Sequence, residues 1–279
     1  HIITRMIVGG AQENTLLTAI GHIENGNKCV LVTGPSSGPE GELLRRKSIP
    51  PQLEVIECPY LCREINPIKD ALAYFWLKNF FRKRNFDVAH THSSKAGIIG
   101  RAAAKSASVP VIVHTIHGLP FHKYENPLKN EIYILAERWA AKKCHKILAV
   151  AQAMIEQSVA AKIAEREKFK LVHSGMELDP FTKNKARENI RANLGIAPKT
   201  LVVGTVARLF PLKGYEDFIP VAAKIAKDIP STEFIIVGDG IMKKEIEKRA
   251  QDLNLKFHFA GLVSPDKVPD YISAMDLLI

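Results

Sequence analysis

The sequence predicts an α/β protein made of two domains, each with its own parallel sheet. Short β-rich apolar runs recur along the 279 residues, with helical patterns between most of them. Strands that alternate with helices form parallel sheets. A polar stretch between residues 173 and 199 interrupts this rhythm, which then restarts. With 46% apolar residues, such a chain is expected to bury about 70–75% of its unfolded surface and to form two domains rather than one.

The first predicted domain covers residues 1–175 and the second covers residues 176–279. The strands expected in the first domain are Ile2–Val8, Cys29–Thr33, Leu53–Ile56, Val88–His92, Val111–Thr115, Ile147–Val150 and Lys170–His173. Those expected in the second are Leu201–Ala207, Glu233–Val237, Lys256–Ala260 and Asp276–Ile279. Gly175 and Pro180 mark the boundary, and a helix is expected over Lys183–Leu194, stopped at Gly195.

Both ends of the sequence resemble truncations. His1 stands inside a strand pattern, and Asp276–Ile279 resembles the opening of a buried strand. A parallel sheet normally has both faces covered, so a domain is not expected to stop in mid-strand. The chain is therefore expected to be a fragment whose second domain is incomplete.

No segment predicts export or membrane insertion. No apolar run approaches the roughly 18–20 residues that cross a bilayer, and the N-terminus lacks a signal-peptide pattern. The cysteines are scattered, which favours reduced structural thiols over a disulfide framework; they are Cys29, Cys58, Cys62 and Cys144. A cytoplasmic location is expected.

The net charge of +10 is concentrated in the first domain. Residues 1–173 hold 24 Lys and Arg against 15 Asp and Glu, whereas the rest hold 15 against 14. Part of the excess lies in Tyr74–Phe86, where aromatic and basic residues alternate; they are Trp76, Lys78, Phe80, Phe81, Arg82, Lys83 and Arg84. A solvated basic helix face is the favoured interpretation. Peripheral contact with an anionic membrane is the alternative. No nucleic-acid recognition motif appears, so nucleic acid is not expected as a partner.

Glycine-containing turns after three of the predicted strands are candidate phosphate sites. Ligands of open α/β sheets bind at the carboxyl ends of the strands, where helix N-termini offer free N–H groups. The turns contain Gly9 and Gly10, the segment Gly204–Gly214, and Gly238 with Gly240. The first turn lacks the three-glycine dinucleotide pattern, which argues against a nicotinamide dehydrogenase. A plain tight turn remains an alternative for each.

The segment Gly204–Gly214 carries two cations between a predicted strand and a helix start. Arg208 can hydrogen-bond two phosphate oxygens through its planar guanidinium, and Lys213 supplies a point charge. Such a pair suits a diphosphate leaving group, which gains negative charge as its bond breaks. Taken singly, the two residues would be ordinary solvated cations.

The order of motifs in the chain resembles glycosyltransferase family 4. In the second domain, Gly204–Gly214 is followed by Val237-Gly-Asp-Gly240, His258-Phe-Ala-Gly261-Leu, Val268-Pro-Asp-Tyr271 and Ala274-Met-Asp276. In the first domain, Gly9-Gly10-Ala11-Gln12, the segment Asp87–Ala96 and His114-Thr-Ile-His117-Gly118 are similar to that family's acceptor-domain motifs. The resemblance implies the GT-B fold, in which two Rossmann-like domains face a cleft, with the nucleotide sugar held mainly by the second.

The resemblance also implies roles for individual residues. Arg208 and Lys213 would bind the donor diphosphate, Gly10 would approach it, and His117 would contact the transferred sugar. The remaining donor-side residues would be Gly9, Gly238, Gly240, Leu262 and Val263. The acceptor-side residues would be His92, Ser93 and Lys95.

Several positions depart from the family pattern. Gln12 replaces a frequent Glu, Ala151 replaces a frequent Ser, and His173–Glu177 replaces a commoner Pro-Asn-Gly turn. The family's two glutamates that hold the donor sugar and ribose would lie beyond Ile279. These departures leave the subfamily and acceptor open, and we expect residues 1–279 to be inactive alone.

The histidines invite comparison with a metal site. His90 and His92 share a face of one predicted strand, and His114, His117 and His122 follow. The spacing matches no zinc pattern, Cys58 and Cys62 have no partner pair, and no Asp-x-Asp occurs. No metal or other cofactor is therefore expected.

With these features, the resemblance to glycosyltransferase family 4 implies a retaining hexosyltransferase. It would move a sugar from a UDP- or GDP-linked donor to an acceptor hydroxyl, in surface polysaccharide or glycolipid synthesis. The acceptor is unknown, and a lipid-linked glycan at the inner face of the membrane would fit the basic first domain. The alternatives are a GT-B-type sugar-nucleotide epimerase and a non-catalytic two-domain sugar-binding protein.

Overall fold

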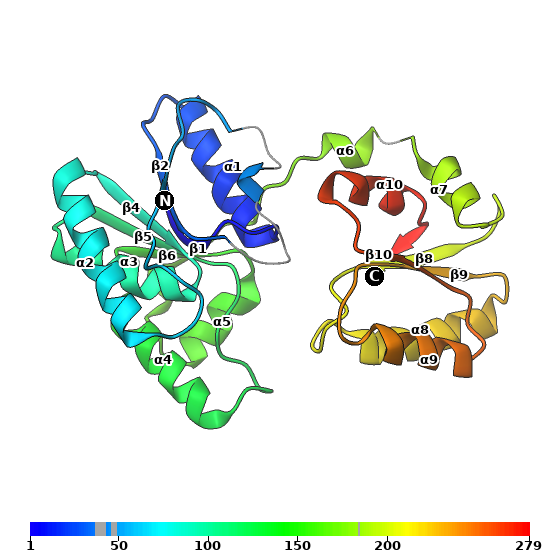
Figure 1. Cartoon of the computed structure of the whole chain (residues 1–279). Coiled ribbons are helices and arrows are strands. Elements are labelled where there is room, and N and C mark those ends of the chain that lie inside the picture. The colour runs from blue at the N-terminus through cyan, green and yellow to red at the C-terminus, as the bar shows by residue number, and fades with distance from the viewer. Residues whose placement is uncertain (37–42, 46–48, 184) are drawn as a thin grey trace. The chain divides into compact units, whose positions relative to one another are not determined.

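The computed structural model describes residues 1–36, 43–45, 49–183 and 185–279 and divides into two compact units (Figure 1). The first unit is His1–Met176 and the second is Glu177–Ile279. Each unit contains one parallel sheet, in the order β3-β2-β1-β4-β5-β6-β7 in the first and β10-β9-β8-β11 in the second. Both sheets are thus of the Rossmann-like type that the alternation of strands and helices predicts.

The sheet of the first unit comprises seven strands. They are β1 (Ile2–Arg5), β2 (Val30–Gly34), β3 (Glu54–Glu57), β4 (Val88–His92), β5 (Val111–Ile116), β6 (Lys146–Ala149) and β7 (Phe169–Leu171). The chain crosses from β3 to β4 past β1 and β2, so β1 lies beside β4 although 82 residues separate Arg5 from Val88. This crossing is the switch point beside which ligands of such sheets bind.

The helices of the first unit are α1 (Gly10–Glu24), α2 (Pro67–Arg84), α3 (Ser94–Ser106), α4 (Pro127–Ala141) and α5 (Gln152–Ala160), with short 3₁₀ turns at Leu43–Arg45 and Arg166–Lys168. Two of them begin at Asn-Pro. The Asn66 side chain accepts a hydrogen bond from the Lys69 N–H, and the Asn126 side chain accepts from Leu128 and Lys129. Proline at the first helical position lacks only an N–H that would have no partner there.

Alternation along the strands gives the first sheet an apolar layer on each face. Ile3 and Leu31 pack in a cluster with Leu16 and Ala19 of α1. Their neighbours Ile2 and Val32 point the other way, into a larger cluster that includes residues of α2, α3, α4 and α5. Burial on both faces is what a parallel sheet requires.

The second unit is smaller and follows the same plan. Its strands are β8 (Val202–Val206), β9 (Glu233–Val237), β10 (Phe257–Gly261) and β11 (Leu277–Leu278). Its helices are α6 (Asp179–Thr182), α7 (Arg187–Asn193), α8 (Tyr215–Asp228), α9 (Lys243–Asp252) and α10 (Val268–Ser273), with a 3₁₀ turn at Pro265–Lys267. The β9 segment Phe234–Val237 is at most 2% exposed, which makes this strand the centre of the unit.

Two predictions about the second unit need correction. The helix predicted over Lys183–Leu194 begins only at Arg187, and residue 184 of the predicted span lies outside the described residues. The strand predicted to be buried at the end of the chain is half-exposed, because among the described strands β11 pairs only with β8. The Asp276 carboxylate before it is held by the buried Arg191 at 2.8 Å and by the Val202 N–H at 2.8 Å.

Three aromatic residues of α2, Trp76, Phe80 and Phe81, pack toward the sheet, whereas Phe75 is exposed. Phe81 is buried, and Trp76 and Phe80 pack against the same core cluster. Trp76 and Phe80 stack on each other with ring centroids 5.3 Å apart. The helix turns these three aromatics toward the sheet, so peripheral contact of this segment with an anionic membrane, the alternative interpretation, would have to use other side chains.

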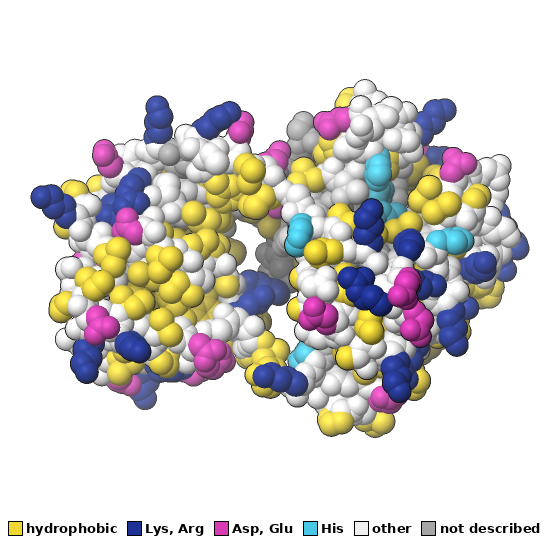
Figure 2. Space-filling view, turned by 180° about the vertical axis from the view of Figure 1, so that it is seen from behind, with side chains coloured by type: hydrophobic (Ala, Val, Ile, Leu, Met, Phe, Trp, Pro, Cys, Tyr) yellow, Lys and Arg dark blue, Asp and Glu magenta, His cyan; other side chains and the backbone are white. Residues whose placement is uncertain are grey.

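The surface shown in Figure 2 carries no uninterrupted basic face. Lys and Arg side chains stand among Asp and Glu side chains on both units in this view. No helix among the described residues is both long and apolar enough to cross a membrane.

Candidate functional site

Three turns of the second unit meet at the carboxyl edge of its sheet. They follow β8, β9 and β10, which are neighbours in the sheet. The Leu209 N–H donates to the Asp239 carbonyl at 2.9 Å, and the Gly238 N–H donates to the Gly261 carbonyl at 2.9 Å. The turns predicted to bind the donor therefore form one hydrogen-bonded surface, which places Arg208, Gly238 and Gly240 beside one another in the fold.

The two glycines of the β9 turn fit against the backbone of the Arg208 loop. A Cβ on Gly238, whose φ is +144°, would lie 2.0 Å from the Ala207 carbonyl oxygen. One on Gly240, at φ +158°, would lie 2.3 Å from the Leu209 carbonyl oxygen. Any side chain at either position would push the loop away. Close packing thus accounts for these glycines independently of a ligand.

Gly238→Ala is expected to lower the free energy of unfolding by about 1–3 kcal/mol, because the added methyl meets backbone rather than a flexible side chain. Urea unfolding measures this loss. Gly10→Ala is the matched control, since nothing lies within 4 Å of its Cβ. Wild-type stability in Gly238→Ala would contradict the packing role.

Arg208 and Lys213 are both exposed on the loop between β8 and α8. The Arg208 guanidinium carbon lies 5.5 Å from the centre of the Phe210 ring. Gly214 caps α8 at φ 78°, a left-handed conformation that favours glycine. In the part of the chain that the structure describes, no acidic side chain forms an ion pair with either cation, so both charges are available to a ligand.

Leu262 and Val263 follow β10 at the same edge and differ in burial. Leu262 is 80% exposed, whereas Val263 packs against a core cluster that includes Val237 and Ala274. Of the two, only Leu262 presents its side chain to solvent beside the glycine turn.

The first unit places a second group of polar residues at the carboxyl edge of β1, β4 and β5. Ser93 follows β4 with φ 59° and ψ 156°, a conformation that is costly for any residue but glycine. Its hydroxyl lies 2.7 Å from that of Thr4, which also accepts from the Ala96 N–H at 3.2 Å. Thr4 therefore holds the start of α3 in place, and the strained serine marks this edge as a candidate site.

Gly9 and Gly10 lie at the same edge, at the start of α1. Gly10 is exposed and has open space where a side chain would be. The helix N-terminus here offers free N–H groups to an anionic ligand.

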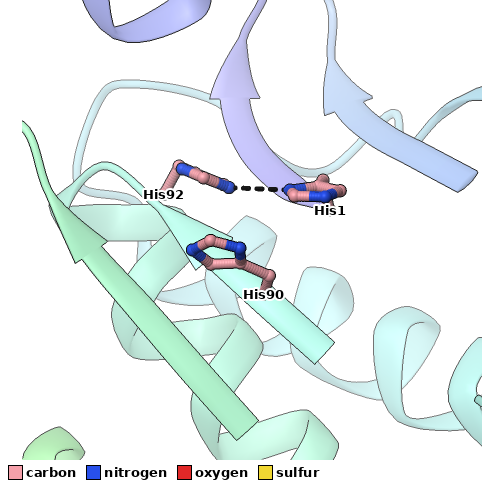
Figure 3. Close-up of side chains that lie close together, drawn as sticks. All are labelled: His1, His90 and His92. Carbon is pink, nitrogen blue, oxygen red and sulfur yellow. Dashed lines mark hydrogen bonds between the residues drawn. The ribbon is translucent and has the colours of Figure 1, made fainter. Parts of the chain in front are cut away.

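A chain of histidines runs from the start of β1 to the carboxyl ends of β4 and β5. Figure 3 shows His1 beside β1, with its ring turned toward His90 and His92 of β4. A ring nitrogen of His1 lies 2.9 Å from one of His92, whose other nitrogen lies 3.0 Å from His117. His90 is hydrogen-bonded to the Thr115 hydroxyl at 2.7 Å. The prediction that His90 and His92 share a strand face is confirmed by their ring centroids, which are 4.2 Å apart.

Burial favours the neutral form of four histidines at this edge. It lowers the pKa of His90 to about 3 and that of His117 to about 4. Burial likewise lowers the pKa values of His92 and His114 well below the ordinary value. A neutral imidazole donates through one nitrogen and accepts through the other, so the chain can exist without charge.

The ring nitrogens of His1, His90 and His92 lie within 4.8 Å of one another, close enough to share a metal ion. The sequence prediction considered His114, His117 and His122 in this connection and not His1. Hydrogen bonds occupy both ring nitrogens of His92 and one ring nitrogen each of His1 and His90.

Comparison with known protein families identifies the family of the chain that carries these two sheet edges. The model described as Glycosyltransferase Family 4 matches residues 8–180, more than half of the chain. The chain belongs to glycosyltransferase family 4. A second model, described as Glycosyl transferases group 1, matches residues 186–279.

Curated relatives of this family 4 chain are longer than it is. The UDP-Gal:alpha-D-GlcNAc-diphosphoundecaprenol alpha-1,3-galactosyltransferase of Escherichia coli is 32% identical over 228 residues, which cover 79% of this chain and 58% of the relative. The alpha-monoglucosyldiacylglycerol synthase of Acholeplasma laidlawii is 28% identical over 60% of this chain and 45% of its own. The chain thus spans about half the length of these relatives.

Solved structures confirm the GT-B type of fold for this family 4 chain. Anabaena Alr3699/HepE, solved in complex with UDP and glucose, matches with a TM-score of 0.71 at 22% identity, over 99% of this chain and 72% of that one. Sucrose-phosphate synthase from Thermosynechococcus elongatus matches with a TM-score of 0.78 at 18% identity, over 99% of this chain and 73% of the synthase chain.

Lys95, predicted on the acceptor side of this family 4 chain, is held by α2. Its ammonium group lies 2.6 Å from the Asp70 carboxylate and also donates to the Glu64 carbonyl. Lys95 therefore joins α3 to α2, and a ligand would have to compete with Asp70 for it.

A pocket at the edge of the first unit is supported by a buried ion pair that the sequence did not reveal. Ser93, His114, His117, Glu137 and Ser158 are among its lining residues. Arg101 is fully buried and donates to Glu137 at 2.7 Å. The partners lie on α3 and α4, 36 residues apart, and no local pattern signals such a pair.

Proposed function

We propose that this chain is part of a glycosyltransferase that moves a sugar from a UDP-linked donor to a hydroxyl of a lipid-linked acceptor, with retained anomeric configuration. The observation that carries the proposal is the surface formed by the Arg208 loop and the glycine turn after β9, where the loop that carries two exposed cations leads into the N-terminus of α8. Such a surface suits a diphosphate.

UDP is favoured over GDP by the relatives. The Escherichia coli relative is named for UDP-Gal, and Anabaena Alr3699/HepE was solved with UDP and with UDP-glucose. The lipid-linked acceptor is favoured by two printed names, one with a diphosphoundecaprenol acceptor and one with a diacylglycerol product. A cytoplasmic location follows from the use of a nucleotide sugar.

In the proposed reaction the bond between the sugar C1 and the diphosphate oxygen breaks, and the diphosphate keeps the electron pair. The acceptor oxygen bonds to C1 and loses its proton. Arg208 and Lys213 stabilise the charge that develops on the departing diphosphate. Their two positive charges make a metal unnecessary for that task.

His117 is proposed to contact the transferred sugar. Burial lowers its pKa to about 4, so at neutral pH it is an uncharged hydrogen-bonding group. Its Nε2 is hydrogen-bonded to His92, which leaves Nδ1 for a sugar hydroxyl. His92 and Ser93 would act on this side by fixing the position of His117 and the start of α3.

A thermal-shift screen tests the donor assignment on the 279-residue chain. UDP and UDP-sugars are expected to raise the melting temperature more than GDP does; at 100 times the dissociation constant, the added stability is about 2.7 kcal/mol. EDTA is expected to leave the UDP effect unchanged. Stabilisation by free sugars and not by UDP would favour a sugar-binding protein instead.

A further inference from the structure

Helix α4 carries a row of exposed apolar side chains along its outer face. Leu128, Ile132, Leu135 and Trp139 recur at spacings of four, three and four residues, which places them on one side of a helix. Their exposed fractions range from 72% for Leu128 to 49% for Trp139. Tyr124, in the loop one turn before, is 68% exposed and extends the row.

The opposite face of α4 is already used for packing. Glu137, Ala140 and Ala141 are buried against the first unit. A surface helix normally presents polar residues outward once its apolar face is buried. The outward row of α4 is instead apolar, and exposed rows of this kind mark interaction surfaces.

Lysines lie at both ends of the row, and Glu125 and Glu131 lie beside its first half, where they pair with Lys129 and Arg138. Lys123 and Lys129 lie at its beginning, and Lys142 and Lys143 lie at its end. The Lys143 ammonium stands 4.0 Å from the centre of the Trp139 ring, and that of Lys123 stands 4.7 Å from the Tyr124 ring. Aromatic rings with lysines beside them suit the boundary between lipid headgroups and acyl chains.

Helix α2 carries a second exposed apolar row near the first. Ile68, Leu72 and Phe75 are between 44% and 75% exposed and lie on one side of α2, and Ile65, which precedes the helix, is 77% exposed. Helix α3 contacts both α2 and α4, which stand on either side of it (Figure 1). Both helices follow strands of the parallel sheet, β3 and β5, so both rows begin toward the edge that carries Ser93 and His117.

We propose that these two rows, which we call the α2–α4 face, rest on an anionic lipid bilayer. The apolar side chains would enter the interface while the flanking lysines meet the headgroups, so that apolar burial and charge act together. The positive charge of the first unit favours a bilayer over a protein partner of mixed charge. This contact would hold the histidine edge near a membrane surface, and it does not depend on which donor the chain uses.

Flotation of the 279-residue chain with vesicles tests the proposal. We expect the chain to float with vesicles of phosphatidylcholine mixed with phosphatidylglycerol, and much less with pure phosphatidylcholine. The double variant Leu128→Ser, Leu135→Ser is expected to bind at least about tenfold more weakly. Lys142→Glu with Lys143→Glu is expected to have a similar effect, because each lysine near an anionic membrane surface raises the affinity for the membrane about fivefold.

Matched changes in the second unit are the controls. Val221→Ser removes an apolar side chain that is 44% exposed on α8, and Lys224→Glu with Lys227→Glu reverses two exposed charges on the same helix. Neither control should alter flotation, and all variants should melt like the wild type. The proposal is overturned if the α4 variants float like the wild type. It is also overturned if the chain ignores vesicles and self-associates through this row, seen as dimers that Leu128→Ser, Leu135→Ser dissociates.

Discussion

Replacing Arg208 by alanine is expected to weaken the binding of UDP to this chain by about 10- to 100-fold, which corresponds to the ~1.5–3 kcal/mol of a charge-assisted hydrogen bond. The side chain is exposed on a loop that backbone hydrogen bonds fix against the glycine turn after β9. In the proposed reaction the same contact strengthens as the diphosphate departs, so a turnover assay on a catalytically active chain should show a loss of about 10²–10³. Isothermal titration with UDP measures the binding effect.

Arg249→Ala provides the control for Arg208→Ala. Arg249 lies in the last turn of α9, and its replacement removes the same charge from the same unit. Titrations at one fixed ionic strength should show UDP affinity close to that of the wild type for Arg249→Ala. Equal losses in the two variants would mean that net charge alone governs binding and that Arg208 has no specific role.

The first unit is expected to lose stability as the pH falls from 7 to 5. Burial lowers the pKa of His90 to about 3, compared with 6.5 when unfolded, so over this range only the unfolded state gains a proton there. Stability is therefore full above pH 6.5 and falls as the pH drops toward 3. His90 alone should lower the free energy of unfolding by about 2 kcal/mol between pH 7 and pH 5. His92, His114 and His117, whose pKa values are also lowered by burial, act in the same direction.

Urea unfolding at pH 5, 6, 7 and 8 measures this dependence. In His90→Gln, the loss of free energy of unfolding between pH 7 and pH 5 should be smaller than in the wild type by about 2 kcal/mol. Between pH 7 and 8 the contribution of His90 is expected to be negligible, because the imidazole is neutral in both states. A His90→Gln protein with the full pH dependence of the wild type would show that His90 takes up protons in the folded state.

Much of the fold was predictable because a buried parallel strand requires a short run of β-favouring residues, which can be recognised in the sequence itself. The bounds of β4 and β9 agree with prediction to the residue, and β9 is a short, mostly apolar run. Strand β1 ends at Arg5 rather than Val8, because Met6 leaves the sheet and donates its N–H to Ser36. The loop positions of Arg208, Gly238 and Gly240 followed from the rule that ligands bind at the carboxyl ends of strands.

What the sequence did not show depends on neighbours that are distant along the chain. His1 meets His92 only because the chain returns from β3 to place β4 beside β1. The contact of Thr4 with Ser93 has the same origin. The alternation of aromatic and basic residues in α2 did not show which aromatics face the core, and helical geometry turns Phe81 inward and leaves Phe75 outside. Strand order and helix rotation, rather than residue type, decide these contacts.

Hydrogen–deuterium exchange of the 279-residue chain with and without saturating UDP tests the central claim most directly, because it locates the nucleotide. We predict slower exchange in peptides covering residues 204–214 and 235–242, where the Arg208 loop meets the glycine turn. Slower exchange confined to the first unit, or no change in these peptides while UDP is bound, would contradict the account.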